Sequence, residues 1–236
     1  MNQDNNKGFT LIELMLAMGF VSALLLAIAM TVLQIGNIYN RGLTLKDVNQ
    51  SGRSLASELQ RSIAESSSFD LASKYVSQGG ANPWGGRLCI GQYSYIWNYG
   101  AAIVANDPLR LNKYKNSNNQ IRFIKVLDPN ASYCIDATLD VVPNTAIEIF
   151  NASEHNLVVH NFAISTTATA SDPKTGQQLY NIDFLIGTND QTSLKGNQAA
   201  TKCLIPSDVI VGKSPDPSYC FVDQFDIVAR SGNVTQ

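Results

Sequence analysis

The sequence predicts an α+β protein in which one long N-terminal α-helix packs on an antiparallel β-sheet domain. Three observations lead to this class: an uncharged apolar run near the start, an amphipathic pattern directly after it with no intervening proline, and short strand-like runs through the remainder. The composition, 44% hydrophobic and 15% charged among 236 residues, is that of a folded chain. The net charge of −2 and the scattered Lys and Arg residues argue against nucleic acid as a direct partner.

The apolar run is long enough to cross a membrane. No charged residue occurs from Leu14 to Asn40, and residues 14–35 alone span roughly 30 Å at about 1.5 Å per residue. A cleaved secretory signal has a shorter apolar stretch, of roughly 7–15 residues, followed by a cleavage site of small residues. The leader cation Lys7 predicts that the N-terminus stays in the cytoplasm and that the chain beyond Tyr39 lies outside it.

The helix is expected to continue beyond the membrane as an amphipathic segment. Apolar residues form a stripe whose gap is filled by Gly52, and polar residues cover the other side. The stripe consists of Leu45, Val48, Leu55, Leu59 and Ile63, and the polar side of Lys46, Gln50, Arg53, Gln60 and Arg61. We therefore predict one helix over residues 9–68, with 9–40 in the membrane and 41–68 amphipathic, ending in the serines at 66–68.

The outer domain, residues 69–236, is expected to be rich in strands. Runs of Ile, Val, Phe and Tyr bounded by Asn, Asp, Gly and Pro predict strands at residues 87–97, 120–127, 146–150, 156–165, 179–187 and 220–230. One face of the last two is apolar, with Tyr180, Ile182, Phe184 and Ile186 in one and Phe221, Phe225, Ile227 and Ala229 in the other. This alternation favours an antiparallel sheet covered on one side, and the amphipathic helix is the natural cover.

The four cysteines all lie in the outer domain, and none has the Cys-x-x-Cys spacing of metal or redox sites. An even count in an exported domain indicates two disulfides, with four buried free thiols as the alternative. Three connectivities are possible. We favour Cys89–Cys134 and Cys203–Cys220, because sequential pairs close the shortest loops.

The two histidines do not predict a metal site or a catalytic base. His155 and His160 are five residues apart, so on a strand they point to opposite faces and cannot readily share a metal. His160 falls on the face of Val158, Phe162 and Ile164 and is expected to be a packing residue.

Other short motifs carry no chemistry either. VGKS at 211–214 has Ser207 where a phosphate-binding loop needs Gly, and no nucleophile elbow occurs. Several carboxylates could meet calcium with loop carbonyls but lack EF-hand spacing: Asp183, Asp190, Asp223 and Asp226. The glycosylation triplets at 130, 151 and 233 suggest only exposed turns. We expect no catalytic residue, metal or cofactor.

One motif is specific. KGFTLIELM, followed by the apolar run, resembles the class III signal of type IV prepilins and type II secretion pseudopilins. In that family a short hydrophilic leader ends in Gly, the next residue is usually Phe, and the fifth residue after the cleavage is Glu. Here these are Gly8, Phe9 and Glu13. The resemblance implies that a prepilin peptidase removes residues 1–8 and N-methylates the new Phe9 amine.

The resemblance also gives the acid at position 13 a role. A charged carboxylate near the bilayer costs several kcal/mol unless it is paired. The Phe9 amine lies one helical turn from Glu13, so the carboxylate can neutralise it within the subunit or on a neighbour. Between subunits this pairing would set the axial register of a filament.

Within that family the chain is most similar to PilW-type minor pilins, on RSLASELQRSIAESSSF and FDIVARSGN, and more remotely to J-type minor pseudopilins. Glu13 argues against the K-type tip pseudopilin, and Met30 stands where many major pilins carry Pro. The resemblance implies a non-enzymatic minor pilin that helps initiate assembly at or near the tip of a pilus used in adhesion, motility or DNA uptake. The alternatives are a minor pseudopilin of a type II secretion system and, disfavoured, a signal-anchored periplasmic enzyme.

The resemblance further implies a location and partners. The subunit would sit in the bacterial inner membrane with its C-terminal domain in the periplasm, and would then enter a filament at the cell surface. Its partners would be the prepilin peptidase, other minor and major pilins, and the inner-membrane assembly platform.

Overall fold

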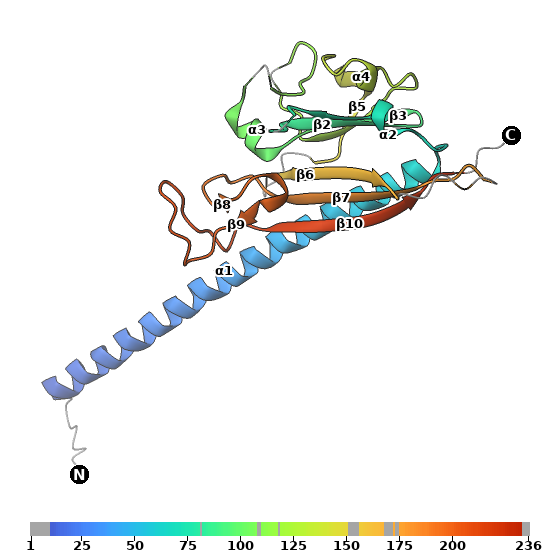
Figure 1. Cartoon of the computed structure of the whole chain (residues 1–236). Helices are drawn as coiled ribbons and strands as arrows, with labels where there is room; N and C mark the ends of the chain where they lie inside the picture. The colour runs from blue at the N-terminus through green and yellow to red at the C-terminus, as the bar shows by residue number, and fades with distance from the viewer. Residues whose placement is uncertain are drawn as a thin grey trace, which may run out of the picture.

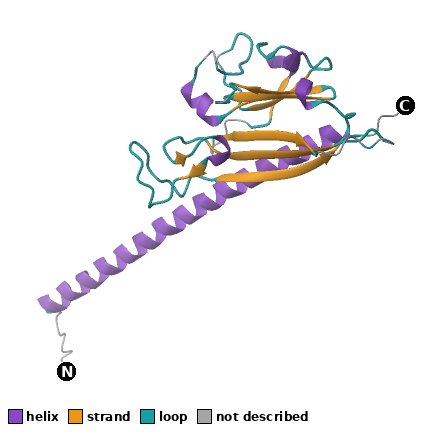
Figure 2. Cartoon of the chain, viewed as in Figure 1, coloured by secondary structure: helices purple, strands orange, loops and turns teal. Residues whose placement is uncertain are grey.

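The computed structural model describes residues 10–80, 82–107, 110–117, 119–150, 156–167, 172 and 175–232. One long helix, α1 (Leu11–Ala64), precedes a domain of antiparallel strands (Figure 1). A short helix, α2 (Leu71–Lys74), precedes the first strand. Further helical segments lie between the strands: α3 (Gly100–Ala105), α4 (Ser132–Ile135) and 3-10 turns at Pro143–Thr145 and Gln198–Ala200. Figure 2 shows two layers of strands stacked on the side of the C-terminal half of α1. The predicted α+β class, a long helix on an antiparallel β domain, is confirmed.

The described strands form three sheets in which every neighbouring pair is antiparallel. The five-stranded sheet contains, in spatial order, β1 (Tyr75–Gln78), β2 (Gly85–Ile90), β3 (Tyr93–Asn98), β4 (Phe123–Leu127) and β5 (Ala146–Glu148). The three-stranded sheet contains β10 (Val222–Arg230), β7 (Leu179–Thr188) and β6 (Leu157–Thr166). A small sheet pairs β8 (Leu194–Lys195) with β9 (Lys202–Cys203). Strands lie in all six predicted regions, whereas β1, β8 and β9 were not predicted.

The region predicted as one strand over 87–97 is instead a hairpin of β2 and β3. Ile90 pairs with Tyr93, and Gly91 between them has a φ of +57°. A two-residue hairpin loop requires positive φ, which Gly adopts without steric cost. The isolated glycine was therefore the signal for the turn.

Helix α1 is shorter at both ends than the predicted 9–68. Its first described helical residue is Leu11, with Thr10 as the N-cap, and its last is Ala64. At the C-terminal end the Ser66 hydroxyl donates to the Ile63 carbonyl (2.9 Å). Such side-chain bonds compete with the hydrogen bonds of the helix backbone. The helix therefore ends at Ala64, before the serines at 66–68.

One core joins the second half of α1 to the inner faces of both larger sheets. Trp97 of β3 lies at its centre, with ring centroids 5.5 Å from Phe123 of β4 and 4.4 Å from Phe162 of β6. From α1 the core takes Val48, Leu55, Ala56, Leu59 and Ile63. The stripe on α1 thus matches the prediction except at its start.

At that start Leu45 is 42% exposed, and Thr44 is buried instead. The buried stripe of α1 begins with two four-residue steps, from Thr44 to Val48 and from Val48 to Gly52. Such steps keep side chains on one face of a helix. The Thr44 hydroxyl also donates to the Ser218 carbonyl (3.4 Å), so the buried threonine has a hydrogen-bond partner.

Candidate functional site

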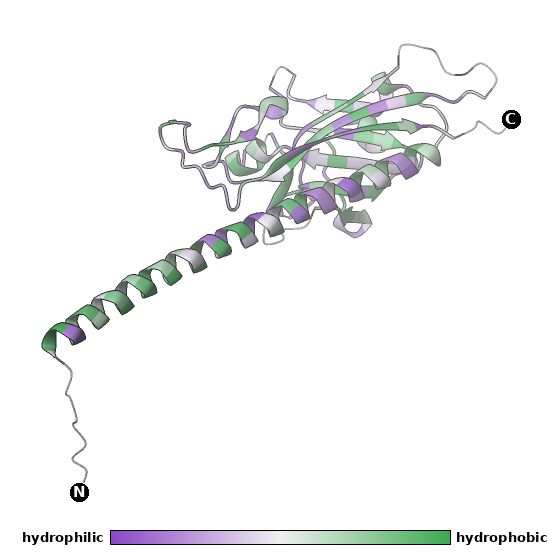
Figure 3. Ribbon diagram, turned by 90° about the horizontal axis from the view of Figure 1, so that it is seen from below, coloured by the Kyte–Doolittle hydropathy of each residue, from purple (hydrophilic) through white to green (hydrophobic). Residues whose placement is uncertain are grey.

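The N-terminal half of α1 has no protein partner among the described residues. Every residue from Leu11 to Tyr39 is exposed, although nearly all are apolar. Figure 3 shows this half as a mostly hydrophobic rod that leaves the domain. By length and composition α1 could cross a membrane. The rod has the length and composition of a membrane anchor or a signal, and it is the first part of the candidate site.

Glu13 is held at the start of this rod by a capping box. Its carboxylate accepts from the Thr10 backbone N–H and from the Thr10 hydroxyl, both at 2.9 Å, while the Thr10 hydroxyl accepts from the Glu13 N–H (3.3 Å). These bonds satisfy backbone donors that a helix N-terminus leaves without partners. In the full-length chain Glu13 therefore has a local partner.

The capping role was not anticipated from the sequence. Its signal was present, because Thr10 and Glu13 have the T-x-x-E spacing of a capping box. Gly8 and Phe9, the predicted cleavage junction, lie outside the described residues. The predicted pairing of Glu13 with a Phe9 amine stays a prediction.

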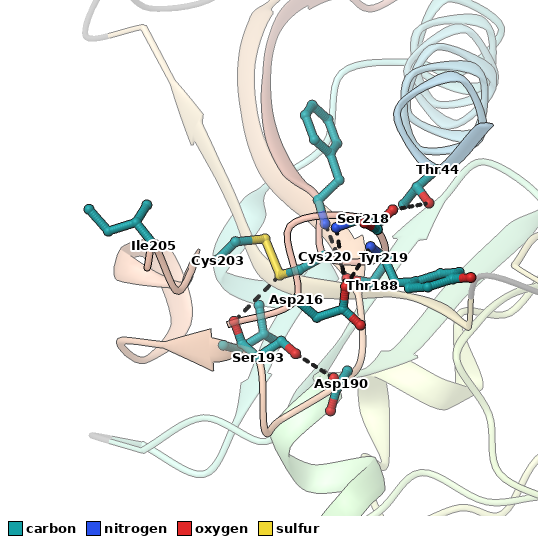
Figure 4. Close-up of a disulfide and its surroundings, with 12 residues drawn as sticks. Thr44, Thr188, Asp190, Ser193, Cys203, Ile205, Asp216, Ser218, Tyr219 and Cys220 are labelled. Atoms are coloured by element: carbon teal, nitrogen blue, oxygen red, sulfur yellow. Dashed lines mark hydrogen bonds between the residues drawn. A yellow bond between two sulfur atoms is a disulfide. The ribbon is translucent and has the colours of Figure 1, made fainter. Parts of the chain in front are cut away.

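The exposed and packed halves of α1 meet at a small polar contact with the C-terminal region. The Asn40 side chain donates to the Tyr219 hydroxyl (2.9 Å), and the Thr44 hydroxyl lies beside the Ser218 carbonyl (Figure 4). These bonds attach the segment before β10 to the point at which α1 enters the domain. They fix where the rod ends and the domain begins.

Above this point β10 packs on α1. Gly52 lies against the Phe225 ring so closely that a methyl group at Gly52 would be 2.1 Å from the ring. Phe225 in turn stacks on Phe184 of β7, with centroids 5.3 Å apart. The glycine therefore provides the space in which the sheet approaches the helix.

An ion pair ties the other sheet to α1. Lys125 of β4 contacts Glu58 at 2.6 Å, and Glu58 also accepts from the Tyr95 hydroxyl (3.0 Å), which lies 2.6 Å from the Ser62 hydroxyl. The ammonium of Lys125 lies 3.8 Å from the Tyr93 ring centroid, a cation–π contact. Partial burial raises the pKa of Glu58, but the bonds from Lys125 and Tyr95 outweigh it and hold that pKa below its usual value.

Both favoured disulfides are present. Cys89 bonds Cys134, tying β2 to α4, and Cys203 bonds Cys220, joining β9 to the segment before β10. The described residues contain no free cysteine. The second bond closes a loop next to α1 (Figure 4).

His160 is a packing residue, as predicted, but on a different face. It is buried, and its Nε2 lies 3.1 Å from the Thr188 carbonyl. A register shift after Val159 makes Val159, rather than Val158 or His160, share the core with Phe162. Burial lowers the pKa of His160 to about 4, so the ring is neutral at pH 7.

The four candidate carboxylates do not gather into one site. Asp183 and Asp226 face each other across β7 and β10, and the Gln224 amide donates to both, at 2.9 and 3.3 Å. Partial burial and the charge of Asp226 raise the pKa of Asp183. The Asp190 carboxylate instead accepts from Thr192 and Ser193 of its own turn, and the Asp223 carboxylate accepts from the Gln224 backbone N–H (3.0 Å). Among the described residues no group of three or more His, Cys, Asp or Glu could hold a metal.

The remaining motifs behave as solvent-facing turns where they are described. In VGKS, the Lys213 ammonium donates to the Leu194 carbonyl, and the described residues after it, up to 232, form no helix that could bind a phosphate. Asn130 is exposed in a turn. His155, Asn151 and Asn233 lie outside the described residues.

Comparison of the chain with protein-family models, with curated proteins and with solved structures gave no match. What the chain shows on its own is a pilin-like shape: a long apolar N-terminal helix whose second half packs on an antiparallel β domain stapled by two disulfides.

Proposed function

We propose that the protein is a minor type IV pilin, a structural filament subunit anchored in the inner membrane before assembly. The observation that carries the proposal is the division of α1 into an exposed apolar half and a half buried in a β domain, directly behind a prepilin-like junction. A filament subunit needs both parts. The exposed half packs in lipid first and against other subunits later, and the buried half transmits that packing to the domain.

The proposed mechanism uses few residues. Peptidase cleavage between Gly8 and Phe9 creates a positive amine one residue before Thr10. The Glu13 carboxylate, which the full-length chain holds against Thr10, is then within one helical turn of that amine. Pairing with the amine of a neighbouring subunit would set the axial register. The β domain supplies contacts to other minor pilins, and no cofactor is required.

Processing tests the signal. We expect Gly8→Ala to leave full-length precursor in the membrane of cells that contain the peptidase, measured by the size of the chain on gels and by N-terminal mass spectrometry. Gly19→Ala is the matched control, because Gly19 lies in the exposed rod with nothing within 4 Å of an added methyl group. Normal maturation of Gly8→Ala would refute the signal assignment.

Glu13 has two roles to separate, the cap and the charge. Glu13→Val removes both, whereas Glu13→Gln keeps a side chain that can complete a capping box but loses the charge. We expect both variants to be cleaved and neither to enter sheared filaments at the wild-type level. If Glu13→Gln is incorporated like the wild type, the residue acts as a cap and the charge-pairing mechanism is wrong.

A further inference from the structure

A second apolar surface lies in the loop that the Cys203–Cys220 disulfide closes. Residues 205–212, here named the apolar loop, read IPSDVIVG. Val209 is 95% exposed and Val211 is 100% exposed, and Ile205 is 54% exposed. Such β-branched apolar side chains are normally buried, and here four of them are exposed within one short segment, because Ile210 is also 40% exposed.

The loop is held in place at its base. The Asp208 carboxylate accepts from the Ile205 N–H (2.8 Å) and from the Lys195 ammonium (2.5 Å), and the Asp208 N–H donates to the Ile205 carbonyl (2.8 Å). Gly212, with a φ of +78°, lies in a second turn. The structure therefore presents the valines on an ordered support, and Figure 4 shows Ile205 beside the disulfide.

The position of the loop is tied to the end of the apolar rod. Tyr219, in the same disulfide loop, accepts from Asn40, which directly follows Tyr39, the last residue of the continuously exposed stretch of α1. Arg41 lines a surface hollow together with Ile205. In Figure 1 the loops around β8 and β9 lie at the end of the domain nearer the N-terminal half of α1. A bilayer that surrounds the rod up to Tyr39 would thus have its surface beside this loop.

The one charged residue of the apolar loop, Asp208, is compensated by a lysine outside it. Lys195 pairs with Asp208, and the Lys213 ammonium donates to the Leu194 carbonyl. The exposed tip, VIV at 209–211, carries no charge. Attraction to a membrane would therefore come from apolar burial and would depend little on salt or on anionic lipid.

We propose that the apolar loop inserts into the membrane interface next to α1, as a second contact that holds the domain against the bilayer. This inference rests on the proposed membrane anchoring of α1. A rod alone leaves the domain free to tilt, whereas a second contact beside it defines the orientation of the domain above the lipid surface.

Tryptophan quenching tests the insertion. Full-length chains with one added tryptophan are placed singly in phosphatidylcholine nanodiscs with or without brominated acyl chains, and the added emission is compared. Val211→Trp probes the loop, and Leu24→Trp probes the rod. Ile135→Trp is the matched control, because Ile135 is 80% exposed in α4, at the part of the domain far from α1 in Figure 1. The native Trp84 and Trp97 contribute the same background to each variant.

We expect brominated lipid to remove most of the added emission of Leu24→Trp and of Val211→Trp, to leave Ile135→Trp unchanged, and to act equally at low and high salt. Quenching of Leu24→Trp without quenching of Val211→Trp would overturn the loop proposal and leave the anchor intact. If Leu24→Trp is not quenched either, both proposals fail. An unquenched but blue-shifted Val211→Trp that appears only with two chains per disc would assign the loop to a second copy and overturn the lipid proposal.

Discussion

The contact between Gly52 and Phe225 predicts whether Gly52→Ala raises or lowers the free energy of unfolding. In an exposed helix interior, replacing Gly by Ala stabilises a protein by about 1 kcal/mol, because Ala loses less backbone entropy. At Gly52 the added methyl group would lie 2.1 Å from Cζ of Phe225. Phe225 is partly buried, and its ring cannot retreat freely because it stacks on Phe184, which belongs to the core. We therefore expect Gly52→Ala to lose stability.

The magnitude follows from comparison with a second glycine. Gly42 lies in the same helix and has nothing within 4 Å of an added methyl group. The helix-propensity gain is common to Gly42→Ala and Gly52→Ala, so the difference between them isolates the cost of overpacking, about 1–3 kcal/mol. Gly42→Ala should raise the free energy of unfolding and Gly52→Ala should lower it.

Denaturant unfolding of the full chain in detergent, followed by tryptophan emission, measures both values. Trp97 reports the outcome directly because it sits in the core that α1 closes. Combining Gly52→Ala with Phe225→Leu completes a double-mutant cycle. The smaller side chain of Leu should relieve most of the destabilisation that Gly52→Ala causes alone. Equal stability of Gly42→Ala and Gly52→Ala would refute the close packing of β10 on α1.

Two further predictions concern titration and charge. In the unfolded state the His160 imidazole has a pKa of about 6.5, whereas burial lowers its pKa to about 4 in the folded state. Only the unfolded state binds the proton between these two values. The free energy of unfolding should therefore decrease by about 3 kcal/mol as the pH falls from about 6.5 to about 4. His160→Gln should flatten that part of the stability curve, measured by unfolding at a series of pH values. Glu58→Gln should cost about 1–3 kcal/mol because it leaves the partly buried Lys125 without its charged partner. The exposed Glu65→Gln, which loses only a surface pair, should cost less than about 1 kcal/mol in the same assay.

The parts of the fold that depend on local periodicity could be predicted. The stripe from Val48 to Ile63 packs as its spacing indicates, and the apolar alternation of β7 and β10 faces the core. The disulfides could be chosen by loop length alone. The stripe and the alternation repeat with the period of a helix or a strand, and loop length is counted along the chain, so a single sequence contains all three features.

The parts of the fold that depend on contacts between residues distant in sequence could not be predicted. Arg87 reads as a surface residue of a strand, yet it is buried, and its guanidinium donates to Asn112 and to the Leu139 carbonyl, 25 and 52 residues away. The bulge at His160 likewise has no local signal, because it reflects how β6 pairs with β7. Thr10 is a different case, because the T-x-x-E spacing that it forms with Glu13 is a local signal of the capping box.

The meeting of the first and last long elements has a consequence for biogenesis. β10, which ends at Arg230, pairs with β7 over nine residues and covers α1, which starts at Leu11. The core between them stays open until β10 has arrived, long after α1 in the order of synthesis. For a chain anchored as proposed, the periplasmic domain could not complete folding while export is under way, and nearly the whole sequence would wait unfolded beside the membrane. Periplasmic chaperones and the disulfide-forming machinery would then act on this subunit before the assembly apparatus can use it.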